Sequence, residues 1–208
     1  MLNRKWMQGA VCLPLTVLML WMAAPVLADN FHYEIRPATR FMADEQGRLT
    51  ALGMNWEYDK EVADVLLQGQ DLSPDKRANT LQNLAQAMVR DLHELGYFTQ
   101  LFVNGQAQPV QRVQEYGAQL SPDGKLQLSF RLPLQQPVEV RNKRMALTLA
   151  DYDGAALIAY QGPRHIVMDD ALVKHCKLPA ITEEIVELPN DHSPTVQTVH
   201  IDCRQDQD

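Results

Sequence analysis

The spacing of apolar residues predicts a β-hairpin near the start of the chain. In FHYEIRPATRFMADEQGRLTALGMNWEYD, residues 31–59, apolar and polar residues alternate on both sides of the turn DEQGR, as they do in half-buried strands. Gly47 in that turn is suited to a positive φ. The next stretch, DKEVADVLLQG, places Val62, Val65 and Leu66 at helical spacing and predicts a short helix.

The clearest helical pattern covers about residues 74–95. Ser73 is suited to the N-cap, Pro74 to the first turn and Gly96 to the position just after the helix. One apolar stripe repeats along this segment: Leu81, Leu84, Ala85, Met88, Leu92 and Leu95. We expect this helix to be the main cover of a sheet.

Segments that read as strands follow the helix. YFTQLFVNG ends in the hairpin signal NG, VQRVQEYGAQL and KLQLSFRLPL flank the turn SPDG, and RMALTLADYD and AALIAYQG come next. Because most connections are short, we expect neighbouring strands to pair antiparallel. The predicted fold class is α+β: an antiparallel β-sheet with one long amphipathic helix packed on a face. The last forty-odd residues, with Pro179, Pro189 and Pro194, are expected to be irregular.

Residues 1–28 are predicted to be a secretory signal peptide. A short basic start precedes the apolar run AVCLPLTVLMLWMAAPVLA, and Val26 and Ala28 fit the cleavage site. The alternative is an uncleaved membrane anchor, which two prolines inside the run disfavour. We expect export to the periplasm and a single periplasmic domain over residues 29–208.

The charge balance argues against two classes of partner. The chain has a formal net charge of −7, and cleavage removes Arg4 and Lys5 but no acid, so the mature chain would carry −9 (−7 − 2). An acidic exported protein binds nucleic acid and anionic membranes poorly. We therefore expect no nucleic-acid partner, and no membrane span after cleavage.

The mature chain keeps two cysteines, Cys176 and Cys203. In an oxidising compartment an isolated pair predicts a disulfide. His175 adjoins one cysteine and His200 lies three residues before the other, so a His/Cys zinc site is an alternative, although the spacing matches no standard zinc module. Free thiols are the third interpretation.

The common catalytic motifs are missing: there is no G-x-S-x-G elbow, phosphate loop or dinucleotide fingerprint. HELGY begins like a zinc-protease helix, but Tyr97 stands where a second histidine is needed, so His93 is interpreted as a solvated or capping residue at a helix C-terminus. DYDG, residues 151–154, has too few oxygen ligands for a calcium loop and is interpreted as a turn. We predict that the protein is not an enzyme, with an uncharacterised hydrolase as a minor alternative.

Histidines are the remaining candidate metal ligands. His32 opens the alternating strand just past the predicted cleavage site. An amino-terminal copper or nickel clamp needs histidine third from the free amine, and His32 is fourth. It is therefore either a ligand in a site that the fold builds, or a half-exposed strand residue. Other candidates lie in the C-terminal segment: His165, Asp169, Asp170, His175, His192 and His200.

The order of several motifs resembles one bacterial exported family. DEQGRLTALGMNWEYDKE, LHELGYFTQLFVNG, LSPDGKLQLSFRLPLQQPVEV and LTLADYD occur in this order over roughly residues 30–160, which leaves a C-terminal segment at about 161–208. Together they are similar to the family catalogued as domain of unknown function 1007. That family is described as a periplasmic component of an uncharacterised ABC-type transport system, and its members are often linked to nickel, cobalt or zinc transporters.

The resemblance also suggests ligand positions. Family members typically open the mature chain with His-Pro-His, which falls on residues 30–32 and keeps only His32, while a family acid falls on Arg36. A Tyr-Asp-Pro-Thr-Tyr-Tyr stretch matches at Tyr152 and Asp153. The resemblance thus implies His32 and Asp153 as metal-site residues, weak binding of nickel, zinc or copper, and an inner-membrane metal transporter as partner. The leading hypothesis is a non-enzymatic periplasmic accessory protein associated with transition-metal transport. The alternative is a periplasmic protein-interaction or structural module that binds no metal.

Overall fold

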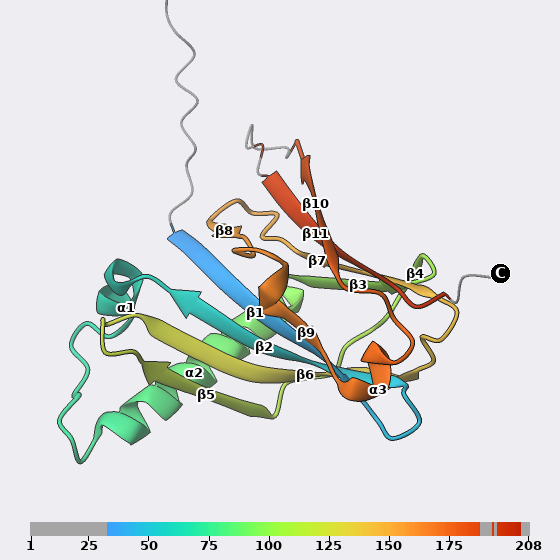
Figure 1. Ribbon diagram of the computed structural model, residues 1–208. Coiled ribbons are helices and arrows are strands. Elements are labelled where there is room, and N and C mark those ends of the chain that lie inside the picture. The colour runs from blue at the N-terminus through green and yellow to red at the C-terminus, as the bar shows by residue number, and fades with distance from the viewer. Residues whose placement is uncertain (1–32, 188–192, 194, 205–208) are drawn as a thin grey trace, which may run out of the picture.

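The computed structural model describes residues 33–187, 193 and 195–204, and two β-sheets dominate this part of the chain (Figure 1). The first sheet has the order β5 (Glu115–Leu120), β6 (Leu126–Val138), β2 (Leu49–Tyr58), β1 (Tyr33–Ala43) and β8 (Ala156–Ile158), and β9 (Ile166–Met168) also pairs with β1. The second has the order β10 (Ala180–Ile185), β11 (Thr195–Asp202), β7 (Arg144–Leu149), β3 (Thr99–Val103) and β4 (Gln106–Ala107).

Helical segments make up a smaller share of the described residues. The helices are α1 (Lys60–Leu66), α2 (Arg77–Glu94) and α3 (Asp170–Val173), with 3₁₀ turns η1 (Gly96–Phe98) and η2 (Pro163–His165). None of the helices in the described residues is long and apolar enough to cross a membrane.

The predicted fold class, α+β with one antiparallel sheet covered by one long amphipathic helix, is wrong. The fold is mostly β, and two sheets face one another where a helix was expected to be the main cover. Helix α2 makes its main strand contact with β5, at the edge of the first sheet, and leads through η1 into β3 of the second sheet (Figure 1). The apolar faces of the strands mostly bury one another, which leaves the helix a smaller part of the core.

The local turn chemistry explains the hairpins, which are confirmed. β1 and β2 pair antiparallel with Arg36 opposite Glu57, and Gly47 in their turn has φ 78°. β5 and β6 form the hairpin around SPDG, where Gly124 has φ 86°. The NG signal joins β3 to β4, with positive φ at both turn residues, as a tight hairpin turn requires. The short helix after the first hairpin is present as α1.

Helix α2 begins later than predicted and ends where predicted. Its first helical residue is Arg77, because residues 73–76 form a turn in which the Ser73 carbonyl accepts from the amides of Lys76 and Arg77. The helix ends before Gly96, which takes φ 59° as a left-handed cap does. Its buried residues are Leu81, Ala85, Val89 and Leu92.

The expectation of an irregular C-terminal segment is wrong. The C-terminal segment is regular: β11 lies in the interior of the second sheet, between β10 and β7. Consecutive strands that pair do so antiparallel, as expected: β1 with β2, β3 with β4, β5 with β6 and β10 with β11. The parallel pairs join β1 to β8 and β9, which lie far from it in sequence. Pro189 and Pro194, two of the prolines behind the expectation of an irregular segment, lie outside the described residues, as do the predicted signal peptide, His32 and His192.

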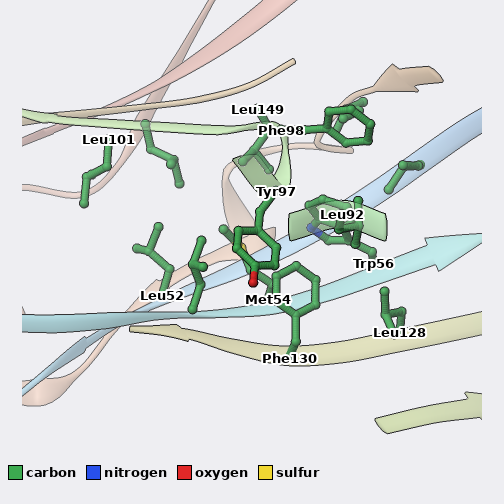
Figure 2. Packing of buried hydrophobic residues seen from close by; sticks show 14 of the residues in the cluster. Leu52, Met54, Trp56, Leu92, Tyr97, Phe98, Leu101, Leu128, Phe130 and Leu149 are labelled. Carbon is green, nitrogen blue, oxygen red and sulfur yellow. The ribbon is translucent and has the colours of Figure 1, made fainter. Parts of the chain in front are cut away.

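The core lies between the inner faces of the two sheets (Figure 2). The first sheet contributes rows that cross three strands, such as Thr39, Met54 and Phe130. Tyr97 of η1 lies among them, next to Phe130 and Met54 in Figure 2, and Trp56 stacks on Phe98 with ring centroids 6.3 Å apart. The second sheet adds the alternating inward residues of its longer strands: Leu101, Val103, Met145, Leu147, Leu149, Val199 and Ile201.

A disulfide joins Cys176 and Cys203, as predicted. Cys176 follows α3 and Cys203 follows β11, so the bond ties the end of a sheet strand to the segment that links the two sheets. Backbone hydrogen bonds hold both sides, from Lys177 to the Asp202 carbonyl and from Cys203 to the Lys143 carbonyl. The disulfide leaves neither sulfur as the thiolate that a zinc site needs.

Candidate functional site

The start of β1 is the part of the described chain next in sequence to the predicted ligand His32. β8 runs parallel to β1, with Tyr33 opposite Ala156. This pairing brings the loop Asp151–Gly154, which contains Asp153, to the same end of the first sheet. The position of His32 lies outside the described residues, so the structure places Asp153 near the strand start but does not test the pair.

Asp151 fixes the shape of this loop. Asp151 is 6% exposed, and its carboxylate accepts hydrogen bonds from the backbone amides of Asp153, Ala155 and Ala156 at 2.9–3.1 Å. This confirms the interpretation of DYDG as a capped turn. Burial raises the pKa of Tyr33, and the charge of Asp151 raises it further. Asp151 is therefore a structural anion whose lone pairs are largely committed to the backbone.

A cluster of charges lies on the outer face of the first sheet, at the same end. It consists of Glu34, Arg36, Glu57, Asp59 and Lys125, all with side chains that are 27–34% exposed. The Arg36 guanidinium donates to both oxygens of Asp59, at 2.5 and 3.1 Å, and to Glu34 at 2.8 Å. It also lies 3.7 Å from Glu57, which accepts from Lys125 at 2.9 Å. We call these five residues the outer-face charge cluster.

Arg36 is the centre of this cluster. The hydrogen bond with Asp59 is the main reason why the pKa of Arg36 is raised, with a smaller contribution from Glu34. A guanidinium stays protonated in proteins and carries no lone pair for a metal. The three carboxylates around Arg36 therefore already have a permanent cation among them, and a divalent ion would have to displace it.

The other predicted ligands are not gathered into a site. His200 shares a 2.9 Å hydrogen bond with Thr182, and His165 accepts from Arg164 at 3.2 Å. Asp169 binds Arg40 at 2.6 Å and accepts from the Ala43 amide. No group of three or more His, Cys, Asp or Glu residues within the described ranges is arranged to hold a metal ion. His93 lies in the last turn of α2, with its ring 5.7 Å from that of Tyr97.

Sequence reasoning missed the outer-face charge cluster, although part of its signal was present. Strand alternation places Glu34 and Arg36 on one face, and the tight turn of the first hairpin sets Glu57 opposite Arg36. The contribution of Lys125 was not readable, because it depends on β6 pairing with the far side of β2.

Comparison with protein-family models identifies a match. The family model described as Protein of unknown function (DUF1007) matches residues 15–189. This range extends beyond the roughly 30–160 over which motifs were visible in the sequence. No curated protein matches the chain.

Proposed function

The chain belongs to the DUF1007 family of proteins of unknown function, and from this premise we propose that it is a non-enzymatic, periplasmic accessory protein associated with transition-metal transport, with weakened metal binding. The supporting observation is the parallel pairing of Tyr33 with Ala156. It sets the loop of Asp153 beside the strand that His32 precedes in sequence. The disulfide is the state expected of cysteines in an exported protein.

Two features support weak rather than tight binding. Even an open zinc site takes three ligands from the protein, whereas the proposed site has two, His32 and Asp153. The acids nearest to the strand start are also engaged: Asp151 by backbone amides, and Glu34 by Arg36. A nickel, zinc or copper ion is therefore bound in the micromolar range or more weakly, which corresponds to no more than about 8 kcal/mol.

Calorimetry on the purified mature protein tests this proposal, with nickel, zinc and copper as separate titrants. The expected result is weak binding of at least one ion that His32→Ala abolishes and Asp153→Asn reduces. His200→Ala is the matched control, because it removes an exposed histidine on β11, in the other sheet.

Two results would contradict the proposal. Tight, stoichiometric binding that survives His32→Ala but not His200→Ala would move the site to the C-terminal segment. The absence of binding by all three ions would leave the protein without the proposed activity and favour the second candidate.

The second candidate is a protein-interaction module that binds no metal, and the open edge of the second sheet favours it. Among the described strands, β10 pairs only with β11, so its other edge has free backbone donors and acceptors. Leu178, just before β10, is 84% exposed, and Ile185 at its end is 73% exposed. An extended segment of a partner could add to such an edge and cover both side chains.

A photo-crosslinking experiment tests this second candidate. A crosslinking residue placed at the exposed Thr182 should trap one defined partner in cells, and Leu178→Asp with Ile185→Asp should abolish the crosslink. The same substitutions should leave metal binding unchanged. A crosslink pattern that is unaffected by both substitutions would show that this edge is not the docking surface.

A further inference from the structure

A polar groove lies between helix α2 and the chain segment that leads into β5. Its volume is about 460 Å³, within the range of small-molecule sites. Its lining residues are Asn83, Gln86, Ala87, Val89 and Arg90 from α2, and Arg112, Val113, Gln114 and Tyr116 from the other wall. Only Val89 and Val113 are buried, so an apolar floor carries polar side chains along its rim. We call this feature the α2–β5 groove.

The wall of the groove is fixed from inside the core. Tyr97 is 1% exposed, and its hydroxyl accepts a hydrogen bond from the backbone amide of Val113 at 3.0 Å. Val113 is itself buried, between the two polar residues Arg112 and Gln114. The hydrogen bond and the burial of Val113 therefore fix the backbone that carries the side chains of Arg112 and Gln114, although this segment is neither helix nor strand. A rim held in place before binding loses less conformational entropy when a ligand arrives.

The charges of the groove differ from those of the whole chain. The chain carries −7, whereas the groove is lined by two arginines and no acid. Arg112 has no hydrogen-bond or ion-pair partner among the described residues, and Arg90 pairs only with its sequence neighbour Asp91, at the exposed surface. The amides of Asn83, Gln86 and Gln114 also make no side-chain hydrogen bond within the described part of the chain.

We propose that the α2–β5 groove is a binding site for a small multivalent oxyanion, such as a polycarboxylate or a phosphate ester. Arg90 and Arg112 are its charge-recognising residues, because guanidinium groups bind carboxylate and phosphate in planar, two-point fashion. The carboxamides donate to the remaining ligand oxygens, and the buried valines exclude water from one side of the ligand. This site is separate from the proposed metal ligands and does not depend on them.

Calorimetric titration of the purified mature protein with citrate, and separately with inorganic phosphate, tests the proposal at about 0.15 M salt, where weak nonspecific attraction is screened. We expect saturable one-to-one binding of at least one probe. Arg90→Gln and Arg112→Gln should each weaken it about tenfold or more. Arg77→Gln is the matched control: it removes an exposed arginine of the same helix that does not line the groove, and should leave binding unchanged.

The two probes separate the ligand sources. Binding of citrate alone favours a polycarboxylate ligand, and binding of phosphate alone favours a phosphate-containing ligand. The proposal would be overturned if neither citrate nor phosphate binds. It would also be overturned if Arg77→Gln weakens binding as much as Arg112→Gln does. Because all three arginines are exposed, circular dichroism should show the same fold for every variant.

Discussion

Gly96, Tyr97 and Phe98 have φ values of 59°, 56° and 50°, so three successive residues are left-handed between α2 and β3. For residues with a Cβ this conformation costs roughly 1–2 kcal/mol each. Packing offsets that strain, since Tyr97 and Phe98 are both buried and the Thr99 hydroxyl donates to the Tyr97 carbonyl. The sequence predicts a strand from Tyr97 onward, because aromatic residues favour strands and only the glycine indicates a left-handed position.

Gly96→Ala should destabilise the protein by about 1 kcal/mol, because alanine is strained at a positive φ. Apart from its chain neighbours and the adjoining helix backbone, no atom lies within 4 Å of the added Cβ, so the loss reports backbone conformation. Gly117→Ala is the matched control, at a strand position without positive φ and with its nearest contact at 3.9 Å. Urea denaturation measures both. Equal effects of the two substitutions would argue against the left-handed turn.

Tyr160 predicts a loss of stability in alkali. Burial raises the pKa of its phenol. The hydrogen bond with Thr39 lowers this pKa, but by a smaller amount than burial raises it. Above about pH 10 the unfolded chain loses the phenolic proton while the folded chain keeps it, so the unfolding free energy falls as the pH rises. Each such tyrosine contributes up to about 1.4 kcal/mol per pH unit.

Urea denaturation between about pH 9 and pH 11 checks this effect. The slope for Tyr160→Phe should be shallower than that of the wild type, even though the variant also loses the hydrogen bond with Thr39. Tyr152→Phe, at an exposed position, should keep the wild-type slope. Parallel curves for wild type and Tyr160→Phe would mean that this phenol titrates normally.

At the scale of elements, helix α2 shows what a periodic pattern predicts well. Its stripe correctly included Leu81, Ala85 and Leu92, which are buried. It also included Leu95, which is 47% exposed beyond the last helical turn, and it omitted Val89. The period gives the direction of the apolar face, whereas the neighbours that cover each position depend on contacts with η1 and β5.

Leu92→Ala should cost about 2–5 kcal/mol, as is typical for a buried leucine, and Leu84→Ala clearly less. The helical stripe alone predicts similar costs for both. The structure separates them, because Leu92 lies in the core beside Trp56 (Figure 2), whereas Leu84 is only half-buried. Thermal unfolding gives the comparison. An unchanged melting temperature for Leu92→Ala would show that this end of α2 is not part of the core.

Strands that pair with distant partners were the least predictable elements. β11 alternates inward residues Gln197, Val199 and Ile201, but nearby prolines favoured an irregular interpretation. Gln197 also interrupts the apolar pattern; its buried side chain accepts from the Tyr160 amide and donates to Glu183. β8, with three residues, is too short to show a period, and its parallel pairing with β1 depends on the whole chain path between them.

At the scale of the whole molecule, chemistry carried by single residue types was predictable, and assembled sites were not. The disulfide was predicted from two cysteines in a chain expected to be exported. The outer-face charge cluster and the α2–β5 groove each combine segments far apart in sequence, such as Arg36 with Lys125 and Arg90 with Arg112. Their composition depends on how β6 and α2 pack, which no local pattern contains.

Removal of the disulfide should affect the whole molecule rather than one end. Cys176 and Cys203 are 27 residues apart, and closing a loop of this length stabilises the fold by about 3–4 kcal/mol on the chain-entropy model. Between them lie β10 and β11, and β11 pairs with β7 inside the second sheet. Loosening this segment therefore disturbs a sheet whose inner face is half of the core.

Thiol titration of the denatured, unreduced protein should find no free thiol. In urea denaturation, the double variant Cys176→Ala, Cys203→Ala should have an unfolding free energy about 3–4 kcal/mol lower than that of the wild type. Reduction of the wild type should match the double variant, because both lack the cross-link and differ little in packing. Two titratable thiols would refute the bond. An unfolding free energy that stays unchanged when the bond is removed would contradict the chain-entropy account of its contribution.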